Sequence, residues 1–256
     1  MKRTIYLIFL TLFLNLYAQQ QFNYKAVYEL IYKTDSAGMY LNSDLVLLMK
    51  NNENGYFRDY DRFKNDSIKS TEIRSVGAFI NEIVTTNNQT KKIKIHRPFD
   101  NMNVFYSESI PTVWKLLGTE SSINGIKCRE ATLQAYGRNW NACYSEDYPF
   151  QFGPYFFAGL PGLILSLEDN QKFYQFKLIS FKKEDNTIGE SAKAKELPKV
   201  KFYQMVYEQD FAGKFFNNFR MANPTEHEQF RKKYLEAMKR KNTLPIDKSM
   251  RYLFNK

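Results

Sequence analysis

Residues 153–165 read GPYFFAGLPGLIL, and this stretch decides the fold more than any other part of the chain. Glycine tolerates a positive φ or the close approach of another main chain, while proline fixes its own φ and favours an extended residue before it. Between Gly153 and Ser166 there is no acidic or basic side chain, no His and no Cys. The Lys-Ser/Thr pair of a phosphate-binding loop is also missing. The pattern therefore predicts a tight turn that leads into a buried strand near Leu163 and carries no chemistry of its own.

Short β-prone segments separated by polar turns lie on both sides of this turn. Aromatic residues make up 16% of the chain, with 22 Phe and 18 Tyr, and such side chains suit pleated, half-buried surfaces. Residues 92–96 (KIKIH) alternate polar and apolar side chains, as a strand with one buried face does. The sequence predicts a mainly β domain over residues 19–205, a curved antiparallel sheet or half-barrel meander followed by C-terminal amphipathic helices. The expected strands are 24–32, 44–50, 55–63, 77–84, 92–96, 103–107, 113–117, 128–135, 139–145, 163–168, 173–182 and 201–205.

The remaining residues, 206–256, predict a basic and mostly helical segment. Residues 199–256 hold 13 Lys and Arg against six Asp and Glu, in a chain of net charge +10. Asn223, Pro224 and Glu226 form a helix start: a capping side chain, proline at the first helical position and an acid in the first turn. Apolar side chains recur at helical spacing at Phe211, Phe215, Phe216 and Phe219, and again at Phe230, Tyr234 and Met238. The second helix either makes peripheral contact with a membrane or a partner, or packs over the sheet, and we favour packing because it needs such an apolar stripe.

The first 18 residues predict a signal peptide. Lys2 and Arg3 precede the apolar run 5–14, and Ala18 offers a cleavage site. The run is shorter than the roughly 20 residues that a membrane-spanning helix needs, which disfavours the alternative of an uncleaved anchor. No second long apolar segment follows. We therefore expect an exported protein in the periplasm, on the outer membrane surface or secreted, with no transmembrane segment in its mature chain.

Two cysteines, Cys128 and Cys143, lie on a predicted hairpin over residues 128–144. Side chains alternate along a strand, so Cys128 shares a face with Glu130, and Cys143 shares a face with Asn141. If the apolar faces of the two strands coincide, both cysteines lie on the polar face. A loop at 134–137 would place them directly opposite, whereas a loop at 135–138 would make the pair diagonal and the bridge strained. The shared face and the export signal together predict a structural disulfide.

Several classes of chemistry are disfavoured. His96 and His227 are far apart, and no carboxylate cluster has ligand spacing, so no metal site is expected. Ser145 stands beside Glu146 and Asp147 but lacks a nearby His, so no catalytic residue is assigned. The basic residues gather in the tail rather than on the folded platform, so nucleic-acid binding is not expected. No cofactor is expected either.

The run Gly159, Leu160, Pro161, Gly162, Leu163 and Ile164 resembles the GLPGLI family, exported proteins that are found mainly in Bacteroidetes and are named for this run. The likeness covers essentially the whole mature chain and is densest over residues 114–177, through GRNW at 137–140 and YSEDYP at 144–149. Two positions depart from it: Cys143 stands where members often carry Trp, and Ala158 where they often carry Cys. The resemblance implies an exported protein whose molecular role is unassigned, and it carries over no catalytic residue.

The expected function is non-enzymatic binding of an unknown ligand or envelope protein. The candidate binding residues are Arg138, Trp140, Tyr144, Asp147, Tyr155 and Phe157. For the aromatic side chains near the turn, however, we favour the interpretation that they fill the core, because Phe is usually buried. Three further hypotheses remain open. A carrier of a lipid-like ligand would need a large apolar concavity in the half-barrel, an enzyme of undetected mechanism would need Arg138, Glu146 and Asp147 together in a cleft, and a purely structural envelope component would need neither.

Overall fold

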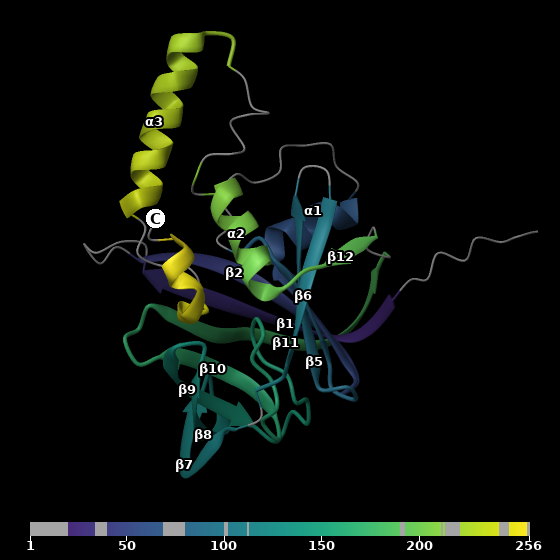
Figure 1. The fold of residues 1–256 in the computed structure, drawn as a ribbon. Coiled ribbons are helices and arrows are strands. Elements are labelled where there is room, and N and C mark those ends of the chain that lie inside the picture. Colours follow the sequence, from purple (N-terminus) through teal and green to yellow (C-terminus); the bar gives the residue numbers. More distant parts are fainter. Residues whose placement is uncertain are drawn as a thin grey trace, which may run out of the picture.

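The computed structural model describes residues 20–33, 40–68, 80–99, 102–111, 113–189, 193–210, 212, 221–240 and 246–254. The signal peptide expected at residues 1–18 lies outside these ranges, and so do Phe211, Phe215, Phe216 and Phe219 of the first amphipathic segment. In the described part, most of the chain forms one large open sheet (Figure 1).

The sheet has 12 strands in the order β12-β6-β5-β4-β3-β2-β1-β11-β10-β9-β8-β7. Neighbouring strands are antiparallel, except that β12 runs parallel to β6. The fold is therefore mainly β, and it matches the curved half-barrel meander expected from the sequence. The strands are β1 (Gln20–Lys33), β2 (Tyr40–Lys50), β3 (Asn54–Asp59), β4 (Ile83–Asn87), β5 (Lys92–Phe99), β6 (Met102–Ser109), β7 (Lys115–Ile123), β8 (Ile126–Ala135), β9 (Arg138–Ser145), β10 (Leu163–Asp169), β11 (Tyr174–Ile188) and β12 (Ala194–Glu196).

Two meanders make up this sheet. The strands β1 to β6 pair in chain order, and so do β7 to β11. The long strand β1 joins the two meanders because it pairs with β2 on one side and with β11 on the other. The pairing of β1 with β11 runs from Gln20 opposite Ile188 to Tyr32 opposite Tyr174. The open sheet therefore has β12 and β7 at its two ends.

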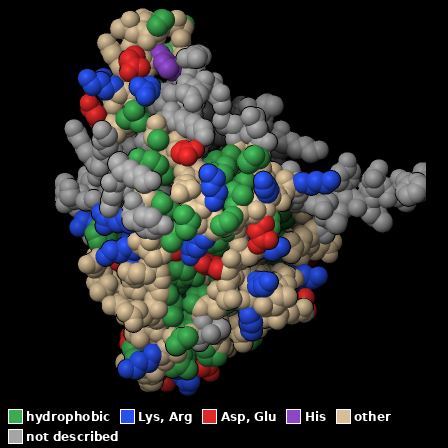
Figure 2. All heavy atoms as spheres, viewed as in Figure 1, with side chains coloured by type: hydrophobic (Ala, Val, Ile, Leu, Met, Phe, Trp, Pro, Cys, Tyr) green, Lys and Arg blue, Asp and Glu red, His purple; other side chains and the backbone are tan. Residues whose placement is uncertain are grey.

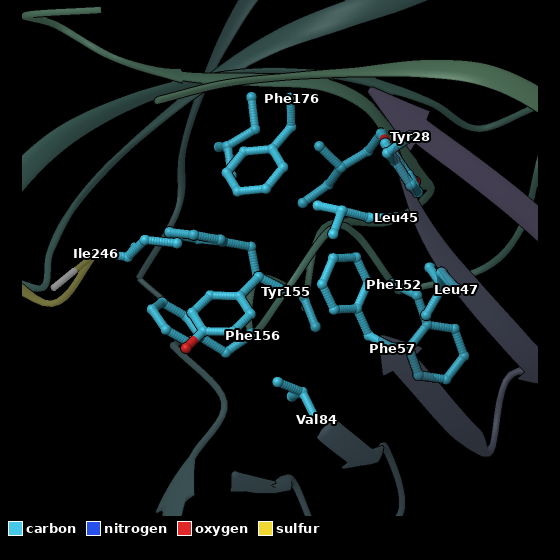
Figure 3. Close-up of a cluster of buried hydrophobic side chains, with 14 of the residues drawn as sticks. Tyr28, Leu45, Leu47, Phe57, Val84, Phe152, Tyr155, Phe156, Phe176 and Ile246 are labelled. Atoms are coloured by element: carbon cyan, nitrogen blue, oxygen red, sulfur yellow. The ribbon is translucent and has the colours of Figure 1, made fainter. Parts of the chain in front are cut away.

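One face of the sheet, here called the inner face, carries the hydrophobic core. Tyr28 of β1, Leu45 of β2, Phe57 of β3 and Phe176 of β11 point from the strands into this core (Figure 3). The segment 146–162, between β9 and β10, packs against them with side chains that are almost fully buried: Phe150, Phe152, Tyr155, Phe156, Phe157 and Leu160. The inner face is thus filled by the protein's own aromatic side chains.

The two glycines of the GLPGLI run have the two different roles that the sequence predicts. Gly159 has a φ of 96°, which only glycine adopts easily. At Gly162 a Cβ atom would lie 2.1 Å from the carbonyl oxygen of Ser145, so the absence of a side chain permits a close approach of β9. The turn leads into β10 at Leu163, which is fully buried. Trp114 Nε1 secures the turn by donating to the carbonyl oxygen of Ala158 at 2.9 Å.

Two expected strands are wrong in part or in full. Residues 60–63, expected in a strand, begin the helix α1 (Tyr60–Ile68) instead. Asp59 causes this change because its Oδ1 accepts a hydrogen bond from the Arg62 main-chain NH at 3.0 Å, as a helix N-cap does. Residues 201–205 lie in the helix α2 (Lys199–Asp210), where Phe202 and Val206 are buried at helical spacing. Several boundaries also shift: β1, β2, β5 and β11 are longer than expected, and β7 begins at Lys115 and extends to Ile123. Of the strand expected at 77–84, residues 77–79 lie outside the described ranges, and β4 begins at Ile83.

The helix α3 (Pro224–Arg240) begins where the sequence predicts. Asn223 Oδ1 accepts hydrogen bonds from the main-chain NH groups of Thr225 at 2.9 Å and Glu226 at 3.4 Å, so Asn223 is the N-cap. The favoured expectation that this helix packs over the sheet is wrong, because α3 projects away from the strands (Figure 1). Phe230 is 45% exposed, and Tyr234 anchors the helix by donating to the carbonyl oxygen of Asp210 at 2.6 Å. The inner face is already covered by the segment 146–162 and α2, which leaves α3 no apolar surface there.

The last described element is the 3₁₀ helix η2 (Lys248–Phe254), which packs near α2. Ile246 and Leu253 are buried at its two ends, and Figure 3 shows Ile246 beside the rings of Tyr155 and Phe156. Within the described ranges, no helix has both the length and the apolar character needed to cross a bilayer.

Candidate functional site

Four of the six candidate binding residues belong to the core. Trp140, Tyr144, Tyr155 and Phe157 expose 0%, 2%, 6% and 1% of their surface. Trp140 packs against Phe157 with ring centroids 4.5 Å apart, and its Nε1 donates to the carbonyl oxygen of Ala135 at 3.1 Å. The favoured interpretation that the aromatic rings fill the core is therefore confirmed, and the hypothesis that they line a groove is wrong. The physical reason is that large aromatic side chains stabilise the fold most when they are removed from water, and the core removes them more completely than a groove does.

The charged candidates do not converge either. Arg138 pairs with the fully buried Asp169 at 3.1 Å, and its Nε donates to the carbonyl oxygen of Ile246 at 3.0 Å. Glu146 pairs with Arg129 at 3.1 Å on the surface, and Asp147 is exposed. Arg138 therefore ties the hairpin to β10 and to the C-terminal segment, away from both acids. This dispersal counts against the enzyme hypothesis that joined Arg138, Glu146 and Asp147.

Cys128 and Cys143 form a disulfide, with their Cα atoms 5.6 Å apart. The hairpin turns at Tyr136 and Gly137, whose φ values are 57° and 68°, so Ala135 pairs with Arg138. This is the later of the two loops that the sequence left open. Glu130 lies directly opposite Cys143, which makes the two cysteines diagonal neighbours on the same face. The bridge lies on the polar face of the hairpin, as the alternation predicts.

That polar face forms part of a groove on the outer face of the sheet, the face opposite the core. The groove encloses about 650 Å³ and crosses β1, β11, β10, β9, β8 and β7. We call it the outer groove. Its polar lining residues are Glu29, Ser121, Glu130, Thr132, Asn141, Ser166, Glu168, Gln175 and Lys177, and its apolar ones include Ile31, Leu117 and Ile123.

The strand register arranges these polar side chains in two rows across the sheet. One row runs from Glu29 through Lys177 and Ser166 to Cys143 and Glu130. The next row runs from Ile31 through Gln175, Glu168 and Asn141 to Thr132. Residues directly opposite each other on adjacent strands lie about 4.5–5.5 Å apart between Cβ atoms. Neighbouring polar side chains of one row are therefore close together, except where Ile31 or the disulfide-bonded Cys143 stands in the row.

Most of these side chains are not satisfied within the protein. In the part of the chain that the structure describes, no hydrogen bond or ion pair involves the side chains of Glu130, Asn141, Ser166, Glu168 or Lys177. Glu29 accepts only a long hydrogen bond of 3.5 Å from Asn42. Their donors and acceptors therefore face water in this structure and can be offered to a bound molecule.

The wall of the outer groove is the curled hairpin of β7 and β8. Asn124, at the tip of this hairpin, donates from Nδ2 to the carbonyl oxygen of Leu178 in β11 at 2.9 Å. The disulfide joins Cys128, which lies close to this tip at the start of β8, to Cys143 of β9. The hairpin that bounds the groove is therefore fixed to β9 and β11 near its tip.

Sequence reasoning found only a part of this site. The alternation along the hairpin places Glu130, Thr132 and Asn141 on one polar face, and this signal was present. Glu29, Glu168 and Lys177 were missed because they reach the groove through the pairing of β1 with β11 and of β10 with both neighbours. These strands are far apart in the sequence, so their pairing cannot be predicted from a local sequence pattern.

The outer groove contains neither a cluster of metal ligands nor a histidine among its described lining residues. Across the described ranges, no group of three or more His, Cys, Asp or Glu side chains is placed to hold a metal ion. His96 lies on β5, stacked on Phe105 with ring centroids 5.1 Å apart, and does not line the groove. Burial, together with the charge of Lys94, lowers the pKa of His96 to about 4, so the imidazole is neutral at neutral pH.

The comparisons with known proteins concern the fold. No family model and no curated protein matches the chain. PNGF-II, solved in two crystal forms, superposes with TM-scores of 0.57 and 0.54 at 15% and 14% sequence identity, over 75% and 74% of this chain. The chain spans only about a third of PNGF-II, 34% of its length. A LolA superfamily protein from Nitrosomonas europaea is matched over 67% of this chain and 87% of its own, at 9% identity and a TM-score of only 0.28. The likeness to PNGF-II thus extends to the fold and no further.

Proposed function

We propose that this chain is an exported, non-enzymatic binding protein of the GLPGLI type that holds a ligand or partner in the outer groove. The observation that carries the proposal is the set of polar side chains on four adjacent strands, Glu130, Asn141, Ser166, Glu168 and Lys177, whose donors and acceptors have no partner within the described residues. A groove of about 650 Å³ lies within the range of ligand sites, which is roughly 300–1,000 Å³. The scattered positions of Arg138, Glu146 and Asp147 favour binding over catalysis.

The alternative of a lipid-like ligand carrier has weaker support. That function needs a large apolar concavity on the inner face of the half-barrel. Phe152, Tyr155 and Phe156 occupy this space in the described residues, and each exposes 6% of its surface or less. A carrier would have to expel this aromatic cluster, at a cost of roughly 1.5–3 kcal/mol for each large side chain moved to water.

Two features support the export and family parts of the proposal. Disulfides persist in oxidising compartments, and Cys128 and Cys143 are joined in one. At Gly159 another residue would be strained, and at Gly162 its Cβ atom would clash with β9. This requirement for glycine explains in physical terms why the GLPGLI run has glycine at both positions. Fractionation of expressing cells with mass spectrometry of the mature N-terminus tests export. We expect a chain that lacks residues 1–18 outside the cytoplasm, and a cytoplasmic chain with these residues intact would contradict it.

Native mass spectrometry tests the binding site. The wild-type chain, purified gently from the envelope fraction, should carry an additional bound mass. Asn141→Trp fills the middle of the groove and should abolish this mass, while Thr187→Trp, an exposed position of β11 that does not line the groove, should retain it. An added mass that persists in Asn141→Trp, or no added mass on the wild-type chain, would count against the outer groove as a binding site.

A further inference from the structure

The wall of the outer groove is also an end of the sheet. The strand β7 pairs with β8 on one side, and no described strand pairs with its other side. Leu117, Ser121 and Ile123 of this strand line the groove. The groove therefore combines a floor of polar side chains with a strand edge whose main-chain NH and C=O groups are available. Extended peptides recognise such edges by adding a strand, with main-chain hydrogen bonds supplying affinity and side-chain pockets supplying specificity.

The geometry of β7 limits how a new strand can pair. The register with β8 breaks between Leu116 and Glu120, and Gly118 there has a φ of 57°. Breaks of this kind in an edge strand oppose indiscriminate pairing with other sheets. Regular pairing continues from Glu120 to Ile123, so a short segment of the edge remains straight. This segment adjoins the groove at Ser121 and Ile123.

The charge of the groove points to the kind of peptide. Its lining holds Glu29, Glu130 and Glu168 against a single basic residue, Lys177, although the whole chain has a net charge of +10. Glu130 and Glu168 have no ion-pair partner among the described residues. The negative charge of the groove lining attracts cationic side chains, although the protein as a whole is basic. Lysine or arginine side chains of a ligand are therefore bound most favourably at this groove.

We infer that the outer groove takes an extended peptide segment rich in lysine or arginine, which adds to the free edge of β7 and sets its cationic side chains against Glu130 and Glu168. This inference rests on the proposed function, because it assigns a ligand class to the same groove. Alternate side chains of an extended peptide point to the same side, so a basic residue at every second position presents its charges to the polar rows.

Fluorescence anisotropy with three labelled hexapeptides tests the inference on the mature wild-type chain. Lys-Thr-Lys-Thr-Lys-Thr should bind. Lys-Pro-Lys-Pro-Lys-Pro carries the same charge but has fewer main-chain NH groups, and it should bind at least tenfold more weakly because proline cannot donate to a strand edge. Glu-Thr-Glu-Thr-Glu-Thr should not bind. Equal binding of the lysine–threonine and lysine–proline peptides, or binding of the glutamate peptide, would overturn the inference.

Variants locate the binding. Glu130→Gln and Glu168→Gln should each weaken the lysine–threonine peptide roughly five- to tenfold, in line with the loss of a charge-assisted contact. Asp147→Asn is the matched control, because Asp147 is exposed and does not line the groove, and it should bind as the wild type does. Equal affinity in all four proteins would mean that the peptide binds elsewhere, against the inference.

The two proposals fail in different ways. If no basic peptide binds but Asn141→Trp still removes a native bound mass, the ligand class is wrong and the groove function stands. If no bound mass depends on the groove and no peptide binds, both proposals are wrong. If spermidine displaces the lysine–threonine peptide as well as an unlabelled copy does, the site recognises charge alone, and the pairing with β7 is wrong.

Discussion

The same strands carry two faces with opposite properties, and β9 illustrates the contrast best. Trp140 points inward and is fully buried, whereas Asn141, the next residue, points outward into the groove and is exposed. The inner face is dry, aromatic and filled, and the outer face is polar and open. Stability therefore depends on one set of alternate residues, and recognition is assigned to the other set. Apart from the sheet, α3 projects from the body, and acidic and basic side chains lie on the face of it that Figure 2 shows.

The largest expected effect comes from the neighbouring pair on β9. Trp140→Ala should lower the free energy of unfolding by an amount near the upper end of about 3–5 kcal/mol, since it leaves a cavity and removes the hydrogen bond to the carbonyl of Ala135. Asn141→Ala should change it by no more than about 0.5 kcal/mol, because the side chain faces solvent. Urea denaturation measures both, and similar losses for the two variants would mean that the faces are not separated in this way.

A smaller effect is expected for two arginines in ion pairs. Arg138→Ala leaves Asp169 charged and fully buried and should cost about 3 kcal/mol, moderated by the hydrogen bond that Asp169 also accepts from the Tyr174 main chain at 2.8 Å. Arg129→Ala breaks the surface pair with Glu146 and should cost at most about 1 kcal/mol. Thermal unfolding compares them. A cost for Arg138→Ala as small as that of the surface arginine would show that the Asp169 site is hydrated.

The disulfide should contribute less to the free energy of unfolding than Trp140 or Arg138 does. It closes a loop of 15 residues, for which loop-closure entropy gives at most about 3 kcal/mol. The double variant Cys128→Ala/Cys143→Ala should thus remain folded but lose about 2–3 kcal/mol. Because the bridge lies under the outer groove, the variant should also bind the lysine–threonine peptide more weakly. Unchanged peptide affinity would indicate that the hairpin keeps its shape without the bridge.

At neutral pH the smallest effect is that of His96, which changes stability only in acid. His96 has a pKa lowered to about 4 in the folded chain, against about 6.5 for a free histidine. Between these values the unfolded chain binds the proton and the folded chain does not, so stability is lost as the pH falls from about 6.5 towards 4. His96→Gln should make the unfolding free energy less dependent on pH in this window. An NMR titration of His96 with a midpoint near 6.5 would contradict the burial of the neutral ring.

Local patterns predicted much of the fold, and non-local pairing explains what they missed. The turn at Gly159 and Gly162, the cap at Asn223 and the shared face of Cys128 and Cys143 depend on neighbours within a few residues, and all three could be derived from the sequence. The groove could not, because Glu29 and Lys177 come together only when β1 meets β11. Whether the aromatic groups near the GLPGLI turn line a groove or fill the core could not be decided from the sequence for the same reason. Their burial depends on strands that are distant in the chain.

The joint between β1 and β11 also has a consequence for the order of folding. Lys25 and Glu184 form an ion pair across this joint, although 159 positions separate them in the chain. Each meander can assemble from hairpins that close short loops, whereas the joint must close a very long one, which makes it a slow step. The first strand to be synthesised therefore waits for nearly the last. Until then the facing edges of β1 and β11 are both open, and an open strand edge can pair with another chain.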